Sequence, residues 1–103
     1  MKLDEDLDER VGLVIIDLST IVSENQLHSL LKKNLGFPDF YGMNWDAFWD
    51  SISGLVEMPK KLKFIGWYKM EHALPHDAHK LKNLLNKLNE KYPSLSVEVE
   101  YKE

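Results

Sequence analysis

The sequence contains no cysteine, and this absence excludes several classes of protein. Without thiols there is neither a disulfide framework nor a thiolate that could act as nucleophile or metal ligand. No apolar run approaches the roughly 20 residues that a membrane-spanning helix needs. Residues 1–10 are acidic and lack an apolar stretch, so we do not expect a signal peptide. These absences favour a cytoplasmic protein without a membrane partner.

Basic residues are missing from one stretch, which runs from Asp39 to Glu57. It carries four carboxylates, two of the three tryptophans, and no Lys, Arg or His. Its formal charge therefore equals the −4 of the whole chain. A local excess of one charge beside large aromatic residues is typical of a recognition surface. An acidic chain is poorly suited to nucleic acid, so we expect a basic protein partner and no direct nucleic-acid binding.

The chain has 103 residues, 44% hydrophobic and 29% charged, which indicates a single globular domain over residues 1–103. Residues 1–10 are expected to be a flexible lead-in. The nearly continuous apolar run over residues 11–18 predicts a strand buried on both faces. A second strand is predicted over residues 61–67, with Trp67 in the core. Residues 94–101 alternate with period two, which predicts an edge strand.

Three helices are predicted between these strands. Ser23 is a plausible N-cap for a helix that continues to about Asn34, and Gly36 suits its C-terminal end. Asn44 is expected to cap a helix from Trp45 to about Leu55, and Pro75 suits the first turn of a last helix over about residues 76–91. Residues 70–74 are predicted to form a separate turn. This order predicts an α/β fold, a small two-layer sandwich with parallel strands and crossover helices. The expected core positions of the first and last helices are Leu27, Leu30, Leu31, Leu35, Ala78, Leu81, Leu84, Leu85 and Leu88.

A helical wheel divides the acidic segment into two faces. Asp46, Asp50, Ser53 and Glu57 fall on one stripe, and Trp49 lies at its border. Like charges one turn apart cost an isolated helix roughly 0.2–0.5 kcal/mol per pair, so the stripe suggests a retained binding surface. The alternative is the solvated face of an ordinary amphipathic helix. The residues expected to face the core are Trp45, Phe48, Ile52, Leu55 and Val56.

A sequence motif adds a resemblance to a known family. The run Phe40-Tyr41-Gly42-Met43-Asn44-Trp45-Asp46-Ala47-Phe48-Trp49-Asp50, followed by Ser53-Gly54 and Glu57-Met58-Pro59, closely resembles the barstar family of intracellular ribonuclease inhibitors. The resemblance implies a three-stranded parallel sheet packed with helices. It also implies no catalysis and no cofactor. The expected partner is a basic ribonuclease or toxin domain, bound 1:1 by a protein that is monomeric when free.

The family's binding mode also implies roles for individual residues. Asp50 would take the place of an RNA phosphate in the enzyme's basic cleft, and Asp46 would support it one turn earlier. Tyr41 and Gly42 would shape the preceding loop, Gly42 with a backbone angle that other residues avoid. The implied binding residues are Phe40, Asn44, Trp45, Asp46, Trp49, Asp50, Ser53, Gly54, Leu55 and Glu57.

The chain departs from the family pattern at three places. Phe40 stands where the family often has a tyrosine, and Leu55 where its best-known member has a tryptophan. That member's last helix contributes an acid to the interface, whereas the corresponding region here offers Lys82, Lys87 and Lys91. Changes at the rim of an interface alter the choice of partner. The partner can therefore be a different toxin domain, and a barstar-like adaptor that binds a non-nuclease protein remains the alternative.

Two further hypotheses are less well supported by the sequence. His72, His76, His79 and Asp77 suggest a metal site, but Pro75 is expected to separate His72 from the helix of the other two. Asp46 and Asp50 could form an acid/base pair, but no nucleophile, histidine or glycine-rich loop accompanies them. We therefore expect neither a metal site nor an enzyme.

Overall fold

The computed structural model describes residues 10–103, and its elements largely follow the predicted order. Of the predicted lead-in only Arg10 lies within this range, and its guanidinium donates hydrogen bonds to the carbonyls of Leu95 and Ser96. No helix in this range is long and apolar enough to cross a membrane. The elements are β1 (Leu13–Asp17), α2 (Glu24–Leu35), α3 (Trp45–Asp50), the π-helical turn η1 (Ser51–Leu55), β2 (Lys61–Ile65), α4 (Trp67–Ala73), α5 (Pro75–Lys91), the 3₁₀ turn η2 (Pro93–Leu95) and β3 (Glu98–Tyr101).

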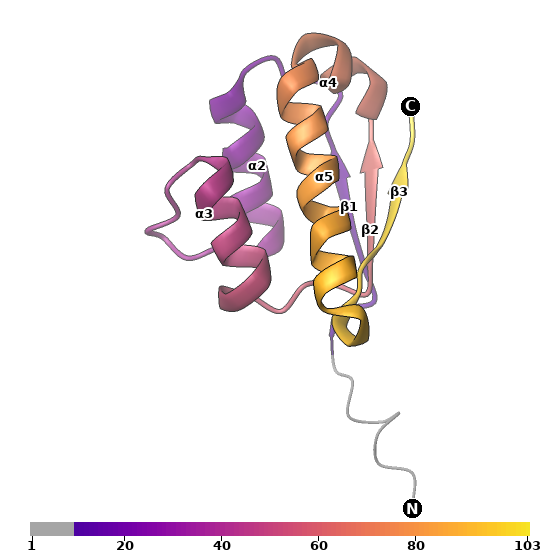
Figure 1. Cartoon of the computed structure of the whole chain (residues 1–103). Coiled ribbons are helices and arrows are strands. Elements are labelled where there is room, and N and C mark those ends of the chain that lie inside the picture. The colour runs from indigo at the N-terminus through magenta and orange to yellow at the C-terminus, as the bar shows by residue number, and fades with distance from the viewer. Residues whose placement is uncertain (1–9) are drawn as a thin grey trace, which may run out of the picture.

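The three strands form one parallel sheet in the order β1-β2-β3. Both crossovers move the chain in the same direction across the sheet. Right-handed connections therefore place their helices on the same face. Figure 1 shows α2, α3 and α5 together on one side of the sheet. The predicted α/β two-layer sandwich with a three-stranded parallel sheet is confirmed.

The prediction that the first strand is buried on both faces is wrong. β1 is an edge strand in which Ile16 is buried, whereas Leu13 and Ile15 are 47% and 49% exposed. With the crossover helices on one side of the sheet, no element of the described residues 10–103 forms a covering layer on the opposite face. The apolar run of β1 lacks the alternation that normally marks such a strand. β3 is an edge strand, as predicted, but it begins at Glu98.

The first and last helices agree closely with their sequence patterns. Ser23 caps α2 by accepting a hydrogen bond from the Gln26 amide, and Gly36 ends it with a left-handed φ of 69°. Pro75 is the first residue of α5, where its missing N–H costs no helical hydrogen bond. The predicted core positions on both helices are buried, apart from Leu30 and Leu84, which are partly buried.

The segment after β2 differs from its prediction. Trp67 is buried, as expected, but it begins helix α4 instead of ending the strand, and α4 replaces the turn predicted over residues 70–74. Gly66 separates strand from helix with a φ of 71°. A Cβ there would lie 2.6 Å from backbone atoms of Ser19. The chain can therefore turn into α4 only through a residue without a side chain.

Candidate protein-binding surface

The acidic helix begins at a side-chain cap. Asn44 has extended backbone angles, and its Oδ1 accepts a hydrogen bond of 2.7 Å from the Ala47 amide. Its Nδ2 donates to the carbonyl of Gly42 at 3.1 Å. The same side chain therefore starts α3, as predicted, and ties the preceding loop to it.

The role expected for Gly42 is wrong. The left-handed backbone angle of this loop belongs to Met43, with a φ of 56°, and Gly42 does not have a positive φ. A Cβ on Gly42 would lie 3.2 Å from Asn44 Nδ2. Glycine therefore leaves room for the capping side chain at this position.

Aromatic side chains hold this loop against the body of the protein. Tyr41 is 6% exposed, and its ring lies 4.8 Å from that of Phe37. The hydroxyl of Tyr41 is 2.6 Å from Nδ1 of His28 on α2. Burial raises the pKa of Tyr41 far above its usual value, so the hydroxyl stays neutral. Phe40, by contrast, is 77% exposed at the tip of the loop.

Trp45 connects three helices. Its ring centroid lies 4.4 Å from that of His28 on α2, and its indole Nε1 donates a 2.9 Å hydrogen bond to Asp77 on α5. No role was predicted from the sequence for His28, and Asp77 was considered only as a metal ligand. His28 lies three residues before Leu31 and seven before Leu35, on the buried face of α2, so its burial could have been inferred from the helical spacing. Trp45 is partly buried, and these two contacts hold α3 against α2 and α5.

The helix changes its hydrogen bonding after Asp50. The amide of Val56 donates to the carbonyl of Ser51, five residues earlier, so η1 is a π turn that ends in extended backbone at Val56. This turn invalidates a regular wheel beyond Asp50. Leu55, predicted to face the core, is 53% exposed, whereas Ile52 is buried as predicted. Glu57 lies beyond the helix and does not continue the acidic stripe.

Asp46 and Asp50 remain one turn apart on the exposed side of α3, beside α5. They border an open hollow of about 390 Å³, which we call the α3–α5 groove. Lys87 lies over the ring of Trp49, with Nζ 4.4 Å from the ring centroid. Trp49 is partly buried, in agreement with its predicted border position. The groove is lined by Trp45, Asp46, Trp49, Asp50, Lys80, Leu84 and Lys87.

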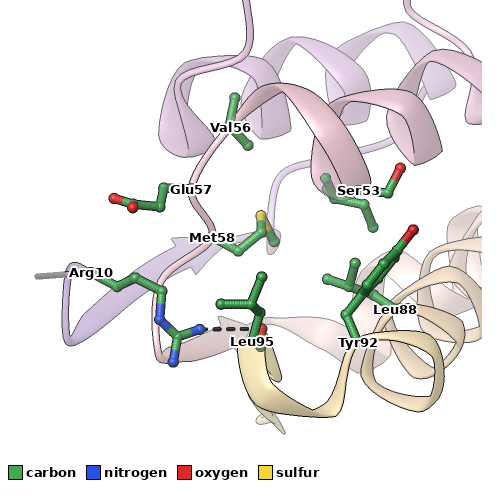
Figure 2. A pocket seen from close by; sticks show the side chains of 9 residues that line it. Arg10, Ser53, Val56, Glu57, Met58, Leu88, Tyr92 and Leu95 are labelled. Carbon is green, nitrogen blue, oxygen red and sulfur yellow. Dashed lines mark hydrogen bonds between the residues drawn. The ribbon is translucent and has the colours of Figure 1, made fainter. Parts of the chain in front are cut away.

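Ser53 and Glu57 line a different hollow, at the far end of the helix (Figure 2). Its volume is about 170 Å³, and its floor is formed by apolar residues that include Met58 and Leu88. The Ser53 hydroxyl donates a 2.6 Å hydrogen bond to the carbonyl of Trp49. The structure therefore divides the predicted stripe. Asp46 and Asp50 share the α3–α5 groove, whereas Ser53 and Glu57 do not line it.

The three histidines outside this region are divided between two helices. His72 is on α4, whereas His76 and His79 are on α5, so they do not share one helical face, as expected. Nε2 of His79 is 3.0 Å from the side-chain amide of Asn83. Within residues 10–103 no group of three His, Cys, Asp or Glu side chains is arranged to hold a metal ion.

The comparison with known proteins assigns the chain to a family. Residues 11–102 match the family described as Barstar (barnase inhibitor), and the chain belongs to this family. Barstars are inhibitors rather than enzymes, in agreement with the prediction that the chain is not an enzyme.

One relative comes from Bacillus subtilis (strain 168). It bears the name "Putative ribonuclease inhibitor YrdF" and is 45% identical to this chain over 49 residues. The matched segment covers 48% of this chain and 54% of that protein, so the match spans about half of the length of each.

Proposed function

We propose that this protein inhibits a small basic ribonuclease that docks on α3 and the loop before it. One observation carries the proposal: Asp46 and Asp50 are exposed one turn apart on a helix that other contacts hold in place. The Asn44 cap fixes the start of this helix, and the Trp45–Asp77 hydrogen bond joins it to α5. Family membership supports the same conclusion.

The mechanism we propose is occlusion of the active site. Asp50 occupies the phosphate position among the enzyme's arginine, lysine and histidine side chains, and Asp46 pairs with a neighbouring cation. Hydrogen bonds between carboxylates and guanidinium groups are charge-assisted and strong. Because α3 is fixed before binding, little conformational entropy is lost on docking. The surrounding contacts would come from Phe40, Asn44, Trp49, Ser53, Gly54 and Leu55.

We further propose a 1:1 complex formed in the cytoplasm by a monomeric inhibitor. Such a protein would protect the cell from its own secreted ribonuclease or from a ribonuclease toxin. Phe40 and Leu55 are 77% and 53% exposed, so they are available to select the partner.

The test is an inhibition titration against a panel of basic ribonucleases. The panel includes barnase and any nuclease encoded beside this gene. We expect a 1:1 endpoint with at least one of them. The variant Asp50→Ala leaves a buried cation of the enzyme without a partner, which should weaken inhibition roughly 10²–10³-fold. Glu90→Ala removes an exposed carboxylate from the end of α5 and serves as the matched control.

Circular dichroism and urea unfolding of both variants test whether the fold is retained. Loss of inhibition in Asp50→Ala alone, with an unchanged fold, supports the proposal. Failure of the wild-type protein to bind any ribonuclease would contradict it. The adaptor alternative, with a non-nuclease partner, would then be favoured.

A further inference from the structure

The two walls of the α3–α5 groove carry opposite charges. Asp46 and Asp50 form the wall on α3, and Lys80 and Lys87 form the wall on α5. All four side chains belong to exposed residues. Within residues 10–103 neither lysine forms an ion pair with either of these aspartates. Both signs of charge therefore remain available to a partner.

The helical geometry of α5 explains why these lysines face α3. Lys80, Leu84 and Lys87 are spaced by four and three residues, so they lie on one face, with the two lysines about 10 Å apart along the helix. Lys82 lies elsewhere on the helix, with Nζ 4.7 Å from the ring centroid of Tyr101 on the sheet. Of Lys82, Lys87 and Lys91, only Lys87 lines the groove. The second lysine of this wall is Lys80.

Lys87 is positioned by its contact with an aromatic ring. Its ammonium lies 4.4 Å from the centroid of the Trp49 ring, a cation–π distance. Trp49 directly precedes Asp50, so a positive charge lies next to the acidic stripe. A partner that covers Asp50 will also approach Lys87.

We propose that the α3–α5 groove is a docking surface of two charge signs, and that it fits a ribonuclease with an acidic side chain beside its basic cleft. The inference rests on the proposed function and adds the chemistry of the partner. A uniformly basic surface would pair with Asp46 and Asp50 but would meet Lys80 and Lys87 with like charge. Unpaired like charges at an interface disfavour the wrong partner and slow its association.

The test compares lysine-to-glutamate variants in their association with the ribonuclease from the panel that the wild-type protein inhibits most strongly. Any such variant makes the protein more acidic and speeds encounter with a basic enzyme in general. Lys33→Glu, on the exposed side of α2, supplies the matched control for this effect. We expect Lys87→Glu and Lys80→Glu to associate roughly 3- to 30-fold more slowly than Lys33→Glu at low salt. The difference should shrink in high salt.

Two further variants separate charge from packing. Lys87→Arg keeps both the positive charge and the stacking on Trp49, so it should associate with the ribonuclease at the wild-type rate. Among residues 10–103 Lys80 makes no cation–π contact, so Lys80→Glu reports the charge without removing the contact on Trp49.

The outcomes distinguish this inference from the proposed function. A complex that Asp50→Ala abolishes, but that Lys87→Glu or Lys80→Glu forms as fast as Lys33→Glu or faster, overturns the inference alone. The absence of any complex with the wild-type protein overturns the proposed function, and the inference with it.

Discussion

The indole Nε1 of Trp45 donates a hydrogen bond of 2.9 Å to Oδ1 of Asp77. Trp45 is the first residue of α3, and Asp77 lies in the first turn of α5, 32 residues later. Asp77 is 7% exposed. The bond therefore joins the two helices that form the α3–α5 groove, and it orients the acidic wall relative to the lysine wall.

Removing the donor should destabilise the protein. Trp45→Phe keeps an aromatic ring beside His28 but leaves the Asp77 carboxylate without this partner. We expect the free energy of unfolding to fall by about 1–3 kcal/mol, as measured by urea denaturation. Asp77→Asn retains an acceptor for the indole and should be less destabilising. Equal stability of Trp45→Phe and wild type would show that the bond contributes nothing to the fold.

His28 makes the stability of this region depend on pH. Burial lowers the pKa of His28, with the nearby Asp77 acting in the opposite direction, and Nε2 has no hydrogen-bond partner in the part of the chain that the structure describes. The unfolded chain, with a histidine pKa of about 6.5, therefore binds a proton at higher pH than the folded protein does. The stability contributed by neutral His28 is fully present above about pH 7 and is lost as the pH falls below about 6.5.

The pKa of His28 should set part of the slope of the unfolding free energy against pH. The free energy of unfolding of the wild-type protein should decrease between pH 7 and pH 5. His28→Gln should show a weaker decrease, although its loss of packing lowers stability at every pH. Urea midpoints at half-unit pH intervals measure both slopes. Parallel curves for wild type and His28→Gln would contradict this account.

Features that depend on local geometry were predictable from the sequence. Ser23 and Asn44 cap their helices because a short polar side chain can accept from the amide three residues on. Gly36 ends α2 because a residue without Cβ adopts the left-handed region freely. The exposure of Asp46 and Asp50 on α3 was likewise predictable from their spacing of one helical turn.

Features that depend on topology or on distant contacts were not predictable. The exposure of Ile15 arises from both crossovers lying on one side of the sheet, which the residues of the strand do not encode. The Trp45–Asp77 bond joins residues far apart in sequence. The π turn after Asp50 redirects Leu55 and Glu57, and a wheel with a constant angle cannot anticipate it.

Gly66 and Gly42 should respond differently to substitution by alanine. Gly66→Ala combines a φ of 71° with a Cβ 2.6 Å from the Ser19 backbone, so we expect a loss of about 2–4 kcal/mol. Gly42→Ala brings a Cβ to 3.2 Å from Asn44 Nδ2, which can shift, so its loss should be about 1 kcal/mol. Gly12→Ala, with open space around it, is the control. Urea unfolding should rank the loss of stability as Gly66→Ala largest, Gly42→Ala smaller and Gly12→Ala smallest. A different order would contradict the close contacts described at Gly66 and Gly42.

Leu55 and Ile52 provide a direct test of the π turn. Ile52 is 4% exposed, and Ile52→Ala should reduce the free energy of unfolding by about 2–5 kcal/mol. Leu55 is 53% exposed, and Leu55→Ala should change it by less than about 0.5 kcal/mol. A regular α-helix with Leu55 in the core would make both changes costly. Comparable losses in the two variants would therefore contradict the π-helical arrangement.

The same Leu55 variant also tests the proposed interface. Because Leu55→Ala should retain the fold, any loss of ribonuclease inhibition would come from lost contact with the enzyme. We expect inhibition to weaken roughly tenfold, since an apolar side chain that is covered on binding contributes about 1–2 kcal/mol. Val22→Ala removes an apolar side chain that is 68% exposed in the segment before α2, outside the proposed binding residues, and should leave inhibition unchanged. Equal inhibition by both variants would place Leu55 outside the interface.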